Sequence, residues 1–438
     1  MATAARRPSR VRGFHFLVAR TGDPDEVLRT VERAVGPRAF RALRWQVTPA
    51  DEGSLVVALP ETPPTAQRMG ILRSQLTAST VELRSGPLET ITNGPAEEPP
   101  SGRQMAAFGV GPAQPDDWYW PVAGRLPKDA YAGSPAIRIA HLDTGIGAHP
   151  SYAGRYDVDG SINPVDFPAD PRGKAVICWP KPLPWDLVDH GTSTAAMIVG
   201  ELTDDPVAAG GVAGLVPPGV AVLVPARVLS DGPVIGPFDV ERVAAAIDWA
   251  VDEADCQVIS ISIGYPIRDQ RFEAAVQRAF GAGVIVCAAA GQVAPMVVWP
   301  AATAIDGWSV CCGGSTAART PFPDSAWWSF PGGYVTIAAP SAGMPKASWL
   351  NRDCSSASPS AWLSGGTSYA APFVASIAAL WLARHRGAIS GMPRDQIVPR
   401  FRAILDHTAI PWADEKIRSN PRYGPGIIDP RAVIESAP

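Results

Sequence analysis

Short apolar segments alternate with segments of helical apolar spacing from about residue 117 to the end of the chain. The expected strands are the apolar runs AIRIAHLD (136–143), AVLVPARVL (221–229), CQVISISIG (256–264) and VIVCAAAG (284–291). The expected helices are GTSTAAMIVG (191–200), DVERVAAAIDWAVDEA (239–254) and RFEAAVQRAFGAG (271–283). Nearly continuous apolar strands that alternate with helices indicate an α/β fold, with a mostly parallel sheet and helices on both faces.

The N-terminal pattern is different and predicts a small unit of its own. Its expected strands are FHFLVAR (14–20), AFRALRWQV (39–47), SLVVALP (54–60) and STVELRSG (79–86). Its expected helices are PDEVLRTVERAVG (24–36) and PTAQRMGILRSQLTA (64–78). The order β-α-β-β-α-β is that of a ferredoxin-like α+β domain.

A segment rich in Pro and Gly, without periodicity, follows this unit and is typical of a linker. We therefore predict a small domain over residues 1–85, a linker over 86–116 and a large domain over 117–438. The small domain has the element order of a prodomain, but a permanent accessory domain fits that order equally well.

Composition narrows the possible partners. The formal net charge is -4, which favours neither nucleic acid nor an anionic membrane as partner. No run approaches the roughly 18 apolar residues of a membrane span, and the apolar N-terminal stretch FHFLVA is too short for an export signal. The six cysteines (178, 256, 287, 311, 312 and 354) form no CxxC pair. We therefore expect a reduced, cytoplasmic protein without a disulfide framework or a zinc site, and the oligomeric state stays open.

Three polar residues stand where such a fold gathers its chemistry. Asp143 ends a buried strand, His190 opens a helix of small residues, and Ser368 opens the last long helix. Pro372 is expected in the first turn of that helix, where a missing N–H costs little. Each residue alone fits a structural role, such as a helix cap. Together, an acid, a base and a hydroxyl are the parts of an activated nucleophile.

The segments around these residues resemble the subtilisin-like serine proteases, the subtilases. They are IAHLDTGIGAHP, HGTSTAAMIVG and GGTSYAAPFVA, in the chain order Asp, His, Ser that subtilisin has. Further segments resemble the family from about residue 117 to the end. The resemblance implies a subtilisin-like fold, and a triad in which Ser368 attacks, His190 transfers the proton and Asp143 orients the imidazole.

The resemblance also implies where substrate binds. Ser262, Ile263 and Gly264 would pair with an extended peptide as an added strand. Ala289, Ala290 and Gly291 would form the other wall of the S1 pocket. The backbone N–H of Ser368 and the side chain of Gln292 would be the two donors of the oxyanion hole.

Several positions depart from the family pattern. Gln292 replaces the usual Asn, Ser193 replaces a second histidine, and Val298 stands where Gly is common, which would narrow S1. The segment DVDGSINPVD (157–166) spaces oxygen atoms somewhat like a calcium loop. It lacks the bidentate Glu at the twelfth position, which favours a solvated loop.

The sequence thus predicts a cytoplasmic serine endopeptidase that acts on a peptide or protein substrate and requires no cofactor. The resemblance leaves calcium possible without placing a site. Two alternatives stay open: a peptide-binding pseudoprotease, suggested by Gln292, and an acyl-transfer peptide ligase or macrocyclase.

Overall fold

The computed structural model describes residues 15–20, 41–45, 54–59, 80–85, 131, 136–176, 190–201, 214–229, 235, 239–265, 268–291, 297–322, 335–342, 344–347 and 362–438. The chain divides into two compact units, Met1–Pro95 and Ala96–Pro438. The domain bounds drawn from the sequence, and the role of residues 1–85, stay predictions.

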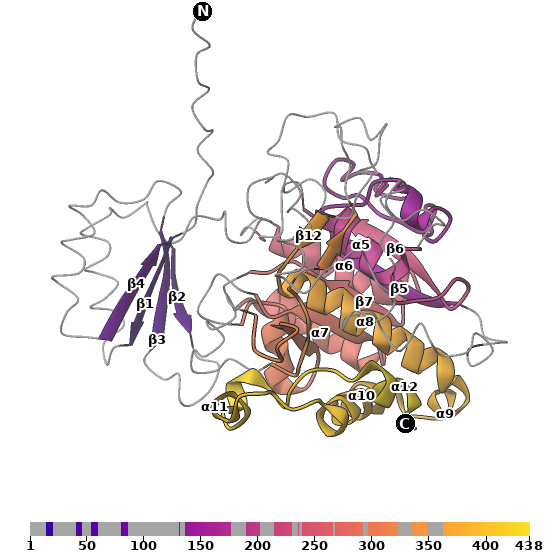
Figure 1. Ribbon diagram of the computed structural model, residues 1–438. Helices are drawn as coiled ribbons and strands as arrows, with labels where there is room; N and C mark the ends of the chain where they lie inside the picture. Colours follow the sequence, from indigo (N-terminus) through magenta and orange to yellow (C-terminus); the bar gives the residue numbers. More distant parts are fainter. Residues whose placement is uncertain are drawn as a thin grey trace, which may run out of the picture. The chain divides into compact units, whose positions relative to one another are not determined.

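The first unit contains one antiparallel sheet (Figure 1). Its strands are β1 (His15–Arg20), β2 (Arg41–Trp45), β3 (Ser54–Leu59) and β4 (Thr80–Ser85). They stand in the order β2-β3-β1-β4, with every neighbouring pair antiparallel. The four expected strands are therefore confirmed. The two helices expected between them lie outside the described residues, so the ferredoxin-like arrangement stays a prediction.

The second unit is built on a six-stranded sheet in the order β10-β9-β8-β7-β5-β6. Its strands are β5 (Ile137–Asp143), β6 (Ala221–Arg227), β7 (Val258–Ile261), β8 (Ile285–Ala289), β9 (Val310–Ser315) and β10 (Ile337–Pro340). Every neighbouring pair is parallel, as the continuous apolar runs predict. A short antiparallel pair stands apart from this sheet. It consists of β11 (Met344–Lys346) and β12 (Trp362–Ser364).

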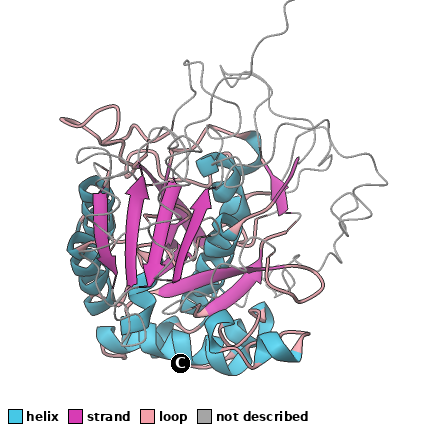
Figure 2. Ribbon diagram, turned by 90° about the vertical axis from the view of Figure 1, so that its left-hand side faces the viewer, coloured by secondary structure: helices cyan, strands magenta, loops and turns pink. Residues whose placement is uncertain are grey.

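Helices cover both faces of the sheet (Figure 2). The helices on and around it are α5 (His190–Val199), α6 (Val240–Asp252), α7 (Gln270–Gly281), α8 (Thr367–Arg384), α9 (Arg386–Ser390), α10 (Arg394–Thr408), α11 (Glu415–Arg418) and α12 (Pro430–Glu435). The described residues also form 3₁₀ helices at Pro150–Tyr152, Ala301–Asp306 and Pro421–Tyr423. The mostly parallel α/β fold expected from the sequence is confirmed.

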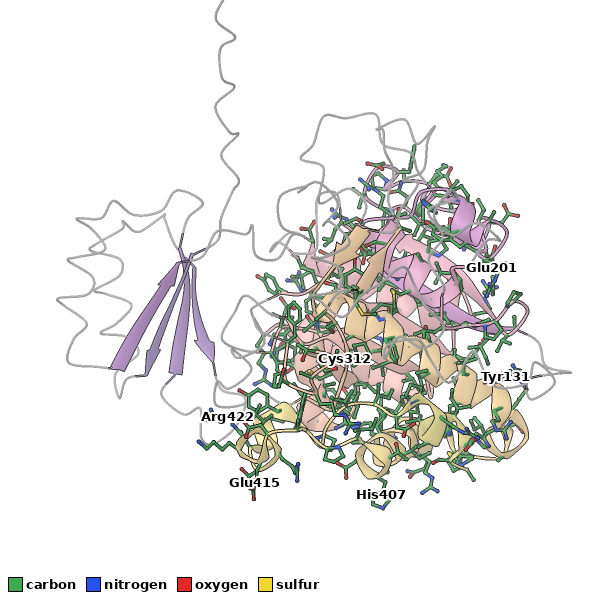
Figure 3. The ribbon with its side chains drawn as sticks, viewed as in Figure 1. Tyr131, Glu201, Cys312, His407, Glu415 and Arg422 are labelled. Carbon is green, nitrogen blue, oxygen red and sulfur yellow. The ribbon has the colours of Figure 1, made fainter. Side chains whose placement is uncertain are left out.

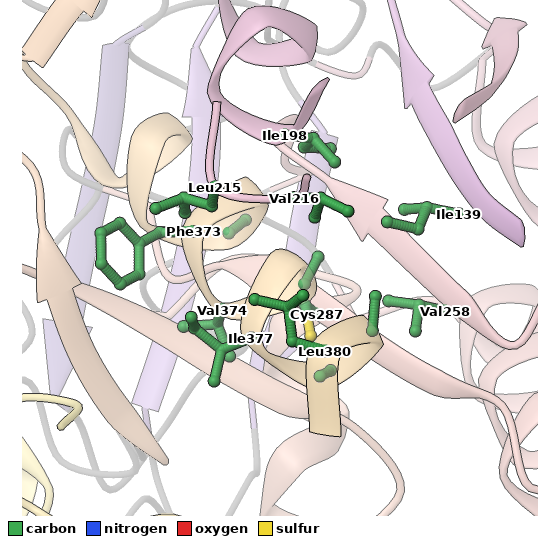
Figure 4. Packing of buried hydrophobic residues seen from close by; sticks show 14 of the residues in the cluster. Ile139, Ile198, Leu215, Val216, Val258, Cys287, Phe373, Val374, Ile377 and Leu380 are labelled. Atoms are coloured by element: carbon green, nitrogen blue, oxygen red, sulfur yellow. The ribbon is translucent and has the colours of Figure 1, made fainter. Parts of the chain in front are cut away.

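Helix α8 is the centre of the hydrophobic core. Sixteen of its eighteen residues are buried, because it packs along several strands of the sheet on one side and against α5 and α12 on the other. Phe373, Val374, Ile377 and Leu380 meet apolar residues of β5, β7 and β8 in one cluster (Figure 4). A helix buried all round is apolar all round. The nucleophile candidate therefore stands at the N-terminal end of a helix that is buried over almost its whole length.

The cysteines of the described part lie inside this unit. Cys256, Cys287, Cys311 and Cys312 are buried and free of disulfides, and Figure 3 labels Cys312. Burial raises the pKa of the Cys256 and Cys311 thiols to about 12, which makes them inert apolar side chains. Cys178 and Cys354 lie outside the described residues.

Candidate active site

The strand β5 and the helix α5 bring Asp143 and His190 together. Asp143 is the last residue of β5, His190 is the first of α5, and both side chains are buried. His190 Nδ1 lies 2.8 Å from Asp143 Oδ1, the same oxygen that accepts the backbone N–H of Thr144 at 2.7 Å. A carboxylate only accepts when ionised, so His190 Nδ1 carries the hydrogen and Nε2 is left to accept a proton.

Burial alone would raise the pKa of the Asp143 carboxyl group. The adjacent His190, its hydrogen bond and the Thr144 N–H outweigh burial and hold the pKa of Asp143 below its ordinary value. Asp143 is therefore ionised at neutral pH. The stabilisation that this brings is present above the ordinary aspartate pKa and is lost as the pH falls through the lowered value.

The first turn of α5 rests directly on the end of β5. The Gly191 N–H donates to Thr144 Oγ1 at 3.1 Å, and the Gly147 N–H donates to Thr192 Oγ1 at 2.8 Å. A Cβ at Gly191 would lie only 2.0 Å from the Gly145 carbonyl oxygen. Only glycine allows this approach, so the small residues of the helix are what bring His190 within reach of Asp143.

Ser368 is the second residue of α8, and Gly366 occupies the N-cap. The sequence placed Pro372 in the first turn of this helix, and that expectation is wrong. Pro372 is the sixth residue, so its missing N–H leaves the carbonyl of Ser368 without its intrahelical donor. The Ser262 hydroxyl takes that place and donates to the Ser368 carbonyl at 2.8 Å.

The two serines are bonded in both directions. The Ser368 hydroxyl in turn donates to the Ser262 carbonyl at 3.1 Å. His190 Nε2 is buried and has no hydrogen-bond partner among the described residues. Asp143 is thus hydrogen-bonded to His190, and Ser368 is hydrogen-bonded to Ser262. The Ser368 hydroxyl points to the Ser262 carbonyl.

The two segments expected to bind substrate lie at the carboxyl ends of β7 and β8, next to Ser368. Ser262 and Ile263 follow β7, while Ala289 ends β8 and is followed by Ala290 and Gly291. The Gly291 N–H donates to Thr367 Oγ1 at 3.2 Å, which ties this wall to the start of α8.

Val298 lies between the two walls. A Cβ at Gly264 would stand 2.3 Å from Val298 Cγ2, and one at Gly291 would stand 2.8 Å from Val298 Cγ1. The valine side chain therefore packs on the Cα atoms of both glycines. The Gly264 carbonyl accepts the Ile235 N–H at 2.9 Å, so this carbonyl is already hydrogen-bonded within the chain.

The other departures from the family pattern have different outcomes. Ser193 donates to the His190 carbonyl at 3.0 Å and accepts the hydroxyl of Tyr369 at 3.3 Å, so it links α5 to the residue after Ser368. Gln292 lies outside the described residues, and its place as an oxyanion donor stays a prediction.

The segment 157–166 uses its polar groups within the protein. Asp157 accepts the Gly160 N–H at 2.9 Å and pairs with Arg138 at 2.8 Å, and Asp166 pairs with Arg227 at 3.0 Å. In the part of the chain that the structure describes, no three His, Cys, Asp or Glu side chains gather where they could hold a metal ion.

Two residues at this site were not singled out in the sequence. His141 Nε2 lies 3.1 Å from the Gly191 carbonyl oxygen, and Thr194 Oγ1 lies 3.3 Å from Asp143 Oδ2. The signal for His141 was available, since it is a histidine inside an otherwise apolar buried strand. Thr194 gave no such signal, because threonine is ordinary in a helix of small residues.

Comparison with known proteins identifies the family. Residues 134–426 match the subtilase family, peptidase S8, and the chain therefore belongs to this family of serine peptidases. It is 28% identical over 285 residues to a thermophilic serine proteinase from Bacillus sp. (strain AK1), a match that covers 63% of this chain and 61% of that relative.

One solved structure shares the fold, and a second is similar at a lower score. The prenylagaramide maturation protease PagA superimposes with a TM-score of 0.51 at 21% identity, over 72% of this chain and 98% of PagA. The patellamide maturation protease PatA gives a TM-score of 0.47 at 22% identity, over 68% of this chain and 95% of the PatA chain. None of the helices in the described ranges combines the length and apolar composition that crossing a bilayer requires.

The contact at Gly191 gives a direct test of how the site is held. Gly191→Ala drives a methyl group into the Gly145 carbonyl and should lower the free energy of unfolding by about 1–3 kcal/mol, the usual cost of overpacking. The shift of α5 should also weaken the bond between His190 and Asp143. Chemical denaturation measures the first effect.

Gly387→Ala is the matched control. Gly387 lies in α9, and a Cβ there meets nothing within 4 Å. This variant should gain up to about 1 kcal/mol from helix propensity. Equal unfolding curves for the two alanine variants would contradict the close approach at Gly191.

Proposed function

We propose that this chain is a serine endopeptidase that hydrolyses peptide bonds with Ser368 as nucleophile, His190 as general base and Asp143 as the group that orients the base. The observation that carries the proposal is the buried bond between His190 Nδ1 and Asp143 Oδ1 at 2.8 Å, beside the N-terminus of α8. Membership of the subtilase family supports the same roles.

The proposed reaction is acyl transfer to water. Ser368 Oγ attacks the carbonyl carbon of the scissile bond while His190 Nε2 takes the hydroxyl proton. The tetrahedral intermediate collapses, His190 gives the proton to the leaving amine, and an acyl-enzyme remains. Water then attacks the ester with His190 again as base, which releases the acid and restores Ser368. No cofactor is required by this sequence of steps.

Asp143 and the start of α8 each have a part in lowering the barrier. Asp143 keeps the hydrogen on His190 Nδ1 and stabilises the imidazolium that forms. The Ser368 N–H is one of the first four of its helix, which lack intrahelical acceptors, so it is suited to bind the developing oxyanion. Gln292 is the second proposed donor, because its carboxamide carries the same N–H as asparagine on a longer stem.

The nucleophile must first turn. Its hydroxyl bonds the Ser262 carbonyl, and attack requires it to face His190 Nε2 instead. Rotation about χ1 alone moves a serine hydroxyl between staggered positions. Catalytic hydrogen bonds often tighten only when substrate is bound. A substrate N–H that pairs with the Ser262 carbonyl would compete with the hydroxyl and release it.

The substrate is proposed to be a particular peptide or protein rather than bulk nutrient. The basis of this choice is the role of one protein of the same fold. PagA, which shares the fold, is a prenylagaramide maturation protease, and maturation of a precursor peptide is the internal role that we favour for this chain. Location and substrate both stay predictions.

The first prediction concerns Ser368. Ser368→Ala should abolish labelling by a fluorophosphonate probe and cleavage of a denatured protein substrate, because it removes the oxygen that the probe and the substrate would acylate or phosphonylate. Ser368 is not the cap of the helix, so the melting temperature should change little. Labelling that persists in the variant would exclude Ser368 as nucleophile.

The same labelling and cleavage assays on the wild-type protein distinguish an endopeptidase from the two alternatives, a pseudoprotease and a peptide ligase. A chain that neither labels nor cleaves would be a peptide-binding pseudoprotease. One that labels and joins peptides to added amines in preference to water would be a ligase. Mass spectrometry of the products separates hydrolysis from acyl transfer to an amine.

The second prediction concerns Gln292. Gln292→Ala should lower kcat with KM little altered, because an oxyanion donor acts in the transition state. In subtilisin, the loss of one such donor lowers kcat by about 10²–10³. Gln292→Asn should retain activity. If the alanine variant cleaves as fast as wild type, another group completes the oxyanion hole.

The third prediction concerns the S1 pocket. Val298 packs on Gly264 and Gly291, so the pocket should accept small or modest apolar P1 residues. Val298→Gly should raise kcat/KM for a P1 Phe or Tyr relative to P1 Ala by at least about 10-fold, the lower bound for one newly accommodated methylene-sized group. A P1-diversified peptide library measures the change.

Val158→Gly, the same substitution at an exposed loop position, is the control and should leave the P1 preference as it is. A wild-type preference for Arg, Lys or large aromatic residues at P1 would show that Val298 does not close the pocket.

A further inference from the structure

A buried histidine stands directly behind the Asp143–His190 pair. His141 is the fifth residue of β5, and alternation along the strand places it on the same face as Asp143. Its side chain is 1% exposed. The neighbouring strands present Pro225 and Ser260 at the same level of the sheet. A polar ring at such a position needs a partner, and the partner it has belongs to α5.

The contacts of His141 determine its tautomer. Nε2 lies 3.1 Å from the Gly191 carbonyl oxygen, which can only accept, so Nε2 carries the hydrogen. Thr194 Oγ1 lies 3.2 Å from the same nitrogen and can accept a share of this N–H. The Thr194 hydroxyl then has its own hydrogen for the His190 carbonyl at 2.8 Å or for Asp143 Oδ2 at 3.3 Å.

The surroundings of the ring favour its neutral form. Nδ1 is buried without a hydrogen-bond partner in the described part of the chain, and so is the hydroxyl of Ser260 on the adjacent strand. The charged or titratable groups that face the ring are Asp143 on β5 and His190 on α5. Burial lowers the pKa of His141, and the opposing effect of Asp143 is smaller. His141 is therefore an uncharged N–H donor at neutral pH.

We propose that His141 is a positioning residue for the general base: its Nε2–H holds the Gly191 carbonyl and, with Thr194, fixes the first turn of α5 so that the His190 ring stays aligned with the Asp143 carboxylate. Gly191 follows His190 in the chain, and its N–H is already held by Thr144. With His141 on its carbonyl, Gly191 is held through both its N–H and its carbonyl, which lie in the two consecutive peptide units after His190. The proposal rests on the function proposed above for His190.

Alignment of this kind has a large effect on rate. A misplacement of about 1 Å at a catalytic group can cost about 10²-fold. Outer groups that orient a functional histidine in metal sites typically contribute about 10–100-fold, and we expect His141 to act on the same scale. An apolar residue at position 141 would fill the space, but it would remove the N–H that His141 offers to the Gly191 carbonyl and the Thr194 hydroxyl.

The test compares two substitutions of similar length. His141→Gln keeps an N–H donor close to the position of Nε2, and His141→Met keeps the bulk without a donor. The methionine variant should lose about 10–100-fold in kcat with KM little changed. The glutamine variant should recover most of that loss. Fluorophosphonate labelling rates should follow kcat, because they report activation of the nucleophile without a peptide.

His385→Met is the matched control. His385 Nε2 bonds the Ile434 carbonyl at 2.9 Å, a contact of the same kind, at the C-cap of α8 and about 25 Å along the helix from Ser368. This variant should lower the melting temperature and leave kcat unchanged. A loss of kcat that merely tracks the melting temperature across both methionine variants would overturn the proposal.

A spectroscopic readout separates this proposal from the proposed function. In the Ser368→Ala protein, the proton on His190 Nδ1 should give a low-field ¹H NMR resonance. His141→Met should broaden or remove it, and His141→Gln should retain it. These outcomes support positioning even if the wild-type protein does not cleave peptides, in which case the proposed function alone fails. An unchanged resonance and unchanged kcat in the methionine variant would overturn the inference.

A second variant keeps the test decisive if His141→Met does not fold. Thr194→Val is nearly isosteric and removes the hydroxyl that joins His141 to Asp143. It should lower kcat at constant KM and shift the same low-field resonance. Wild-type values for both in this variant would contradict the proposed network.

Discussion

The hydrogen bond between Asp143 and His190 is the constraint around which the second unit is arranged. A carboxylate that is fully buried must be compensated, and Asp143 is compensated by the His190 ring, the Thr144 N–H and the Thr194 hydroxyl. These donors come from a strand end and a helix start that are 47 residues apart. Glycine at position 191 allows α5 and β5 to approach closely enough for these hydrogen bonds, since any side chain there would push α5 away from β5.

Helix α8 connects the hydrophobic core to this site. Its burial along the sheet fixes the position of its N-terminus, and Ser368 is placed by that packing rather than by contacts of its own side chain. Pro372 has an additional effect, because it removes the N–H that would have bonded the Ser368 carbonyl. The Ser262 hydroxyl uses this free carbonyl, which ties the strand end after β7 to the nucleophile candidate.

Further polar residues near the Asp143–His190 pair connect the helices and the strand around it. Ser193 and Tyr369 join α5 to α8 by side-chain hydrogen bonds, and His141 and Thr194 join α5 to β5. Buried hydrogen bonds of this kind help to fix one arrangement of the elements that they join. In this unit they meet at the first turn of α5, which carries His190.

The sequence by itself determined the parallel α/β fold, because strands buried on both faces must be apolar throughout, and the motifs around Asp143, His190 and Ser368 singled these residues out as candidates for a triad. It could not place Pro372 correctly, because the first residue of α8 depends on how Gly366 and Thr367 meet the end of β8. Nor could it show that the Ser368 hydroxyl bonds Ser262, that Val298 packs on Gly264 and Gly291, or that His141 contacts α5. These contacts join residues between 7 and 106 positions apart along the chain, and no local periodicity encodes them. Only the packing of α5 and α8 against one face of the sheet brings them together.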